Sequence, residues 1–152
     1  MTMANHPGAG RESRLLAGEG ETRALAAELA GSLRVGDVIL LHGDLGAGKT
    51  TFVQGLAAAL GAGERIQSPT FTLVAEHAIT LGRLHHMDLY RLNDPEELEG
   101  IGYEDFIDPE DGITVIEWPE RAEDWLPDRY ILVQFDYVDA GHRQVEIRRV
   151  GI

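Results

Sequence analysis

One segment constrains the fold of this chain more than any other, the stretch VILLHGDLGAGKTTF from Val38 to Phe52. Its first four residues are all apolar, which is typical of a short buried strand. The residues from Thr50 to about Leu60 have helical spacing and are followed by Gly61, a common helix end. The segment therefore predicts a buried central strand that leads through a glycine-rich loop into a helix.

The glycine-rich stretch, Gly43 to Thr50, matches G-x-x-x-x-G-K-[ST], the phosphate-binding loop, in the strand–loop–helix context that this motif requires. Glycines let successive backbone N–H groups surround a phosphate, and the helix adds unpaired donors and the positive end of its dipole. Lys49 would reach the β- and γ-phosphates, and the Thr50 hydroxyl can ligate Mg²⁺. The chain has twelve arginines but a single lysine, and that lysine occupies the lysine position of the motif, which argues against a chance match. The loop therefore predicts nucleotide binding.

The rest of the chain favours ATP as the nucleotide. Guanine-specific switch proteins read their base with a motif of the Asn-Lys-x-Asp type. The only lysine of this chain already belongs to the glycine-rich loop, so that motif is absent. We therefore expect ATP rather than GTP.

The charge balance bears on possible partners. Asp and Glu number 26 against 13 Lys and Arg, which gives a net charge of −13. Nucleic acids are bound through clustered cations, so an acidic chain is a poor autonomous binder of RNA or DNA. The basic C-terminal stretch HRQVEIRRV is a small exception that we expect to form a solvated strand at the sheet edge. If the protein serves RNA, we expect it to do so through a protein partner.

The composition also indicates a compartment. The chain has no cysteine and therefore no disulfide framework or thiolate metal site. No apolar stretch approaches the roughly 18–20 residues of a membrane span, and the N-terminus lacks a secretion signal. We expect a cytoplasmic protein with a flexible tail over residues 1–12 and a single domain over residues 13–152.

The remaining segments alternate between helix and strand patterns. Helices are predicted over 21–33, where Leu25, Leu29 and Leu33 share one face, from Asp94 as N-cap and Pro95 onward, and over 119–126. A hairpin is predicted to turn near Thr80 to Gly82, a buried strand over 112–117, and a terminal hairpin around Asp139 to Gly141. Strands that alternate with helices, together with hairpins, favour an α/β domain with a mixed sheet.

Two acidic residues end apolar strands. Asp88 ends LHHMD and Glu117 ends ITVIE, and a carboxylate at the C-terminal edge of an α/β sheet can serve metal binding and catalysis. Of the two, Glu117 follows the better buried strand. The alternative for either acid is that it caps the next helix.

Other polar residues leave their roles open. Ser68, Thr70 and Thr72 precede an apolar strand and would either meet a γ-phosphate or its Mg²⁺, or form a plain Ser-Pro turn. His85 and His86 lack a third ligand at metal spacing, so we interpret them as structural. Trp118 fits packing better than function.

Taken together, GDLGAGKTTF, SPTFTLV, HHMDLYRL, DPEELEGIG and VIEWPE, in this order, resemble the TsaE (YjeE) family of small bacterial ATPases. This family is required for making threonylcarbamoyladenosine in tRNA. The similarity covers roughly Leu15 to Val150. The loop alone would indicate only a superfamily, whereas SPTFTLV, DLYRL and EWPE at these spacings are specific.

The resemblance implies an α/β fold of the P-loop NTPase type, with a mixed parallel and antiparallel sheet flanked by helices. It implies slow, Mg²⁺-dependent ATP hydrolysis that supports a complex of TsaD and TsaB, which modifies tRNA, so that tRNA is met only indirectly. Lys49, Asp88 and Glu117 would be catalytic, and Thr50 and Glu117 would ligate Mg²⁺. ATP would be bound by the following residues: Thr22, Asp44, Leu45, Gly46, Ala47, Gly48, Lys49, Thr50, Thr51 and Arg143.

Two other functions compete with this interpretation. A small P-loop kinase would need an arginine-rich lid, and no such insertion is visible in the sequence. A nucleotide-sensing module would bind ATP and barely hydrolyse it, and Asp88 and Glu117 argue weakly against pure sensing. Alanine at either acid should spare binding and abolish turnover in an ATPase.

Overall fold

The computed structural model describes residues 11–44, 48–63 and 73–152. Seven strands form one sheet, and their bounds are β1 Arg11–Ala17, β2 Val38–His42, β3 Val74–Ile79, β4 Gly82–Asp88, β5 Gly112–Glu117, β6 Tyr130–Asp139 and β7 His142–Val150. The helices are α1 Gly18–Ala30, α2 Lys49–Ala59 and α3 Tyr103–Ile107, with 3₁₀ helices η1 Pro95–Ile101 and η2 Pro119–Trp125. Within these ranges, no helix combines the length and the hydrophobicity that a membrane-spanning helix needs.

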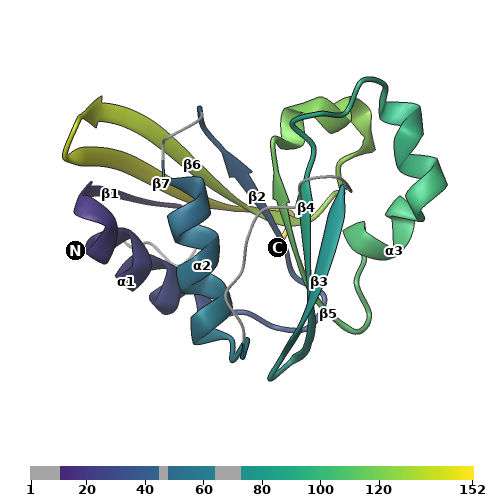
Figure 1. Cartoon of the computed structure of the whole chain (residues 1–152), viewed down its shortest axis with the longest axis horizontal. Coiled ribbons are helices and arrows are strands. Elements are labelled where there is room, and N and C mark those ends of the chain that lie inside the picture. The colour runs from purple at the N-terminus through teal and green to yellow at the C-terminus, as the bar shows by residue number, and fades with distance from the viewer. Residues whose placement is uncertain (1–10, 45–47, 64–72) are drawn as a thin grey trace.

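The sheet is mixed, as predicted. Its strand order is β1-β7-β6-β2-β5-β4-β3 (Figure 1). The four central strands, β6, β2, β5 and β4, run parallel, whereas β7 and β3 run antiparallel to their neighbours. The C-terminal ends of the parallel strands therefore meet at one edge, where α/β sheets bind ligands.

Helices cover both faces of the sheet. Helices α1 and α2 lie on one face, and α3 with the 3₁₀ helices lies on the other (Figure 1). Strand β2 supplies both cores, because Ile39 and Leu41 pack in the first cluster while Val38 and Leu40 pack in the second. An all-apolar strand is the consequence of burial on both faces.

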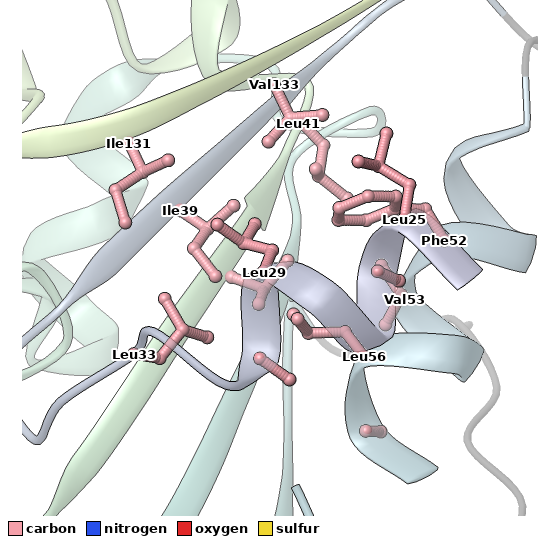
Figure 2. Packing of buried hydrophobic residues seen from close by; sticks show 14 of the residues in the cluster. Leu25, Leu29, Leu33, Ile39, Leu41, Phe52, Val53, Leu56, Ile131 and Val133 are labelled. Carbon is pink, nitrogen blue, oxygen red and sulfur yellow. The ribbon is translucent and has the colours of Figure 1, made fainter. Parts of the chain in front are cut away.

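The predicted leucine face of α1 is confirmed. Leu25 and Leu29 are buried, and Leu33 lies beyond the helix end but joins the same cluster. Figure 2 shows how these side chains lie over the sheet, with residues from α1, α2, β2 and β6 and with Leu33 just after α1: Leu25, Leu29, Leu33, Phe52, Val53, Leu56, Ile39, Leu41, Ile131 and Val133. This packing holds the N-terminal ends of both helices at one edge of the sheet.

The flexible tail predicted over residues 1–12 is wrong at its C-terminal end, where the structure has a strand. Strand β1 begins at Arg11 and pairs antiparallel with β7, so Arg11 and Glu12 belong to the sheet rather than to a tail. Only Leu16 of β1 is buried, which is why no apolar alternation marked this strand. The pairing also places β7 between β1 and β6, so the basic C-terminal stretch is not an edge strand.

The predicted start of the acidic helix is confirmed. Asp94 is the N-cap of η1, Pro95 is its first residue, and Asp94 and Glu97 form a reciprocal capping box. The helix that results is a 3₁₀ helix whose C-cap is Gly102, with a φ of 72° in the left-handed region. Together with α3 and η2, it covers the second core.

Candidate functional site

A cavity of about 430 Å³ lies where the ends of several elements meet. Its walls come from the start of α1, the start of α2, the C-terminal ends of β4 and β5, and the turn between β6 and β7. The lining residues are Gly18, Glu19, Thr22, Gly48, Lys49, Thr50, Thr51, Asp88, Tyr90, Glu117, Trp118, Ala140, Gly141 and Arg143. Segments that lie far apart in the sequence thus converge on one hollow.

Lys49 is one of the two Lys or Arg side chains among the described residues that line this cavity, the other being Arg143. The Lys49 side chain is almost fully buried, and its ammonium donates a hydrogen bond of 2.6 Å to the carbonyl oxygen of Gly43. The Nζ atom also lies 3.8 Å from the centroid of the Trp118 ring, a cation–π contact. Burial lowers the pKa of Lys49, and four carboxylates oppose this shift, those of Glu117, Glu120, Asp88 and Asp44.

Gly48 sets the start of α2. It is the N-cap of that helix with φ of 109°, a backbone conformation that favours glycine. Its carbonyl accepts the first helical hydrogen bond, from the N–H of Phe52 at 2.9 Å. Because the first N–H groups of a helix lack partners within it, this end of α2 presents donors and a positive dipole to the cavity.

Asp88 and Glu117 end neighbouring parallel strands in register. Glu117 shares a sheet face with Ile113 and Val115, and Asp88 shares it with Leu84, so both side chains lie on the face that α1 and α2 cover. Both line the cavity. Two acids that the sequence separates are therefore adjacent at its floor.

The two acids differ in surroundings. Burial raises the pKa of Asp88, as does the nearby charge of Glu117, whereas the Tyr90 N–H, His86 and Lys49 lower it. The Oδ1 atom of Asp88 accepts the Tyr90 N–H at 3.0 Å. Glu117 is almost fully buried, and its Oε2 atom lies 2.6 Å from Nε2 of His86.

The predicted alternative, in which each acid caps the next helix, does not describe Glu117. The N-cap of η2 is Trp118, with no side-chain cap bond, and the Glu117 carboxylate turns toward His86 instead. Asp88 accepts a local bond in the turn to Tyr90, but η1 begins later, behind its own cap, Asp94.

Trp118 has an unusual backbone. Its φ of 57° makes it the sole non-glycine residue with positive φ among the described residues. The conformation turns the indole into the cavity, where it contacts Lys49 and lies 4.9 Å from the Tyr90 ring, centroid to centroid. Trp118 therefore packs, as predicted, but it packs against residues of the site.

Thr22 and Arg143 line the far side of the cavity from the acids' strands. Thr22 is buried on the first turns of α1. Arg143, at the start of β7, donates from Nη1 to the carbonyls of Asp139 and His142, and its guanidinium lies 4.8 Å from the centroid of the Tyr137 ring.

Other predicted residues do not join this group. Asp44 is exposed and does not line the cavity. The remaining loop residues Leu45, Gly46 and Ala47 lie outside the described residues, as do Ser68, Thr70 and Thr72. The described ranges hold no group of three or more His, Asp or Glu side chains that could bind a metal. A cation here would need donors such as the Thr50 hydroxyl and the Glu117 carboxylate, hard oxygens that suit Mg²⁺.

Several residues that line the cavity carry no signal in the sequence, because most contribute backbone or an aromatic surface that no motif marks. Gly18 and Gly141 are joined by a backbone hydrogen bond of 3.0 Å that closes the wall between α1 and the β6–β7 turn. The sequence predicts a structural role for His86, whereas the structure places its ring in contact with Glu117. A polar residue in an otherwise buried strand was the one available signal.

The fold and the site define a class, an α/β protein with a mixed sheet and a cavity at the C-terminal ends of its parallel strands. A family model described as "Threonylcarbamoyl adenosine biosynthesis protein TsaE" matches residues 16–145. The chain belongs to this TsaE family.

Individual relatives agree with this assignment. The chain is 46% identical to TsaE of Haemophilus influenzae over 110 residues, which cover 72% of this chain and 68% of that protein. It is 48% identical to TsaE of a Nostoc species over 137 residues, 87% of this chain and 82% of that one. Among solved structures, YdiB of Bacillus subtilis matches with a TM-score of 0.77 and 30% identity, over 94% of this chain and 88% of that chain.

Proposed function

We propose that this protein binds ATP with Mg²⁺ and hydrolyses it slowly, in support of threonylcarbamoyladenosine formation on tRNA by TsaD and TsaB. The relatives named above carry tRNA threonylcarbamoyladenosine biosynthesis in their descriptions. Membership of the TsaE family supports the biological process. The site supports the chemistry.

One observation carries the proposal. Lys49, Asp88, Glu117, Thr22 and Arg143 come from five elements and line the same cavity at the C-terminal edge of the sheet. Such an edge, with a helix N-terminus behind a glycine-rich loop, is where phosphates bind in α/β proteins.

Each residue has a definable task in this proposal. The Lys49 ammonium and the N-terminal N–H groups of α2 would bind phosphate oxygens and offset the charge of the transferring phosphoryl group. Thr50 and Glu117 would hold Mg²⁺, which would neutralise charge on the phosphates. Asp88 would orient the attacking water. Thr22 and Arg143 would contact the nucleotide from the opposite wall.

We expect slow turnover because few positively charged side chains in the described part of the chain line the cavity. Arg143 is the only arginine among the described residues that line the cavity, and its Nη1 donates to two backbone carbonyls of the β6–β7 turn. The isolated site would therefore lack part of the positive charge that stabilises the transition state, and a partner would supply it. The net charge of −13 likewise favours tRNA contact through TsaD and TsaB rather than directly.

The test is to incubate the purified chain with Mg²⁺ and ATP, alone and then with TsaB, TsaD and tRNA, and to follow phosphate release and tRNA modification together. Phosphate release that rises in the complex and accompanies repeated modification is the expected result, with Lys49→Ala and Glu117→Ala as inactive controls. ATP consumption that ignores these partners but needs a small-molecule acceptor would instead indicate a kinase.

A further inference from the structure

His86 lies on the same sheet face as the two site acids but one step deeper. It is almost completely buried in β4, where it lies opposite Ala75 of β3 and Val115 of β5. The neighbouring position on this face, Leu84, belongs to the apolar core. A buried imidazole in such surroundings is costly unless it has a polar partner.

The partner is the carboxylate of Glu117. The distance of 2.6 Å between His86 Nε2 and Glu117 Oε2 is that of a strong hydrogen bond, and a carboxylate only accepts, so Nε2 carries the donated proton. The other ring nitrogen, Nδ1, is buried and has no hydrogen-bond partner within the described ranges. The Glu117 contact is therefore the polar anchor of the ring in that part of the chain.

We propose that His86 is a positioning residue, which holds one oxygen of Glu117 so that the carboxylate presents a fixed orientation to a divalent cation in the cavity. The inference rests on the proposed function, since it concerns the acid assigned there to Mg²⁺. A carboxylate anchored through one oxygen cannot rotate freely about its last bond, so its second oxygen keeps one position. Groups that hold metal ligands in this way change metal affinity or activity by about 10- to 100-fold when mutated.

His85, the preceding residue in the chain, provides a matched control. Its side chain points to the opposite sheet face, where the ring lies near Phe106 of α3. Its two nitrogens contact the carboxylates of Glu76 at 2.7 Å and Asp111 at 2.8 Å, and it does not line the cavity. Both histidines are buried and paired with acids, but only His86 touches a site acid.

The first experiment separates positioning from general stability. ATP binding is measured by calorimetry in EDTA and again during Mg²⁺ titration, for the native protein, His86→Leu, His86→Gln and His85→Leu. His86→Leu should weaken the Mg²⁺ affinity of the ATP-bound protein by about 10- to 100-fold while leaving metal-free ATP binding unchanged. His86→Gln, which keeps an N–H donor, should recover part of the loss, and His85→Leu should behave as native.

The second experiment needs no nucleotide. In ¹H–¹⁵N spectra of imidazole-labelled protein, the His86 ring should be protonated at Nε2, and its signals should move in Glu117→Gln but not in Asp111→Asn, which should move those of His85. These spectra test the hydrogen bond even if His86→Leu does not fold.

The outcomes are distinguishable. A native protein whose ATP binding ignores Mg²⁺ overturns the proposed function and the cation role of Glu117 with it. A native protein that responds to Mg²⁺, while His86→Leu responds equally, overturns only the positioning role. An unprotonated Nε2 overturns the hydrogen bond on which that role depends.

Discussion

Asp88 and Glu117 lie opposite each other on the parallel strands β4 and β5, and both side chains reach the same cavity. Two carboxylates at such close quarters repel, and the charge of Glu117 contributes to the raised pKa of Asp88, although burial contributes more. The repulsion between the two carboxylates is relieved when a cation binds between them or when one of them is protonated. Without either, it lowers the free energy of unfolding, and that effect can be measured.

We expect Asp88→Asn to stabilise the protein at neutral pH. The folded-state pKa of Asp88 lies above the ordinary value of 3.8, so the protonated form favours folding, and this contribution is full below pH 3.8 and lost as pH rises through the raised pKa. The neutral amide removes that loss. The gain in Tm over the native protein should therefore increase from acidic to neutral pH, as followed by circular dichroism. A gain that is largest in acid would contradict the raised pKa.

Lys49→Met should separate catalysis from stability. The side chain keeps its length and loses its charge, and burial already disfavours that charge, as the lowered pKa shows. We expect Tm to stay level or rise, while ATP turnover falls by about 10²-fold or more for loss of a transition-state contact. Thermal melts and phosphate release on the same preparation check both parts. A variant that melts well below the native protein would mean that the contacts of Nζ with Gly43 and Trp118 stabilise the fold.

Trp118 offers a test of backbone strain beside the site. A left-handed backbone costs a non-glycine residue about 1–2 kcal/mol, and Trp118 adopts it with φ of 57°. Once the indole is removed, Trp118→Gly should therefore be more stable than Trp118→Ala by about 1 kcal/mol. Chemical denaturation measures the difference. Trp125, at the end of η2 and without positive φ, is the control, and there alanine should be the more stable replacement.

Much of the fold could be predicted because apolar spacing and turn residues carry it. The buried run at 38–41 became β2, the hairpin turn at Thr80 and Leu81 joins β3 to β4, and Asp94 caps its helix. Strand β1 could not be predicted, because an edge strand with one buried residue leaves no alternating pattern. Its absence from the prediction also put β7 at the sheet edge, where the structure has β1.

The candidate site was predictable as chemistry but not as geometry. Motif spacing indicates Lys49 and Thr50, and strand ends indicate Asp88 and Glu117, since these are local features. Contacts such as His86 with Glu117 or Lys49 with the Trp118 ring depend on register between strands and on one unusual φ value. Neither is encoded within a short window of sequence.

The contact between α1 and α2 gives the last prediction, because both helices begin at the cavity. A Cβ atom on Gly55 would lie 3.0 Å from Cα and 3.2 Å from the carbonyl oxygen of Arg23, both backbone atoms of α1. Gly55→Ala should therefore separate the helices and destabilise the fold by about 1–3 kcal/mol, despite the better helix propensity of alanine. It should also weaken ATP binding, since Thr22 on α1 and Lys49 on α2 both line the cavity.

Gly20→Ala is the control for this change. Gly20 lies in α1, and a Cβ atom there would meet nothing within 4 Å. Alanine at this position should raise the free energy of unfolding by about 0.5–1 kcal/mol and leave ATP affinity unchanged. Denaturant titration and calorimetry on both variants make the comparison. If Gly55→Ala proved as stable as Gly20→Ala, with native ATP affinity, the spacing of the two helices would not control the shape of the cavity.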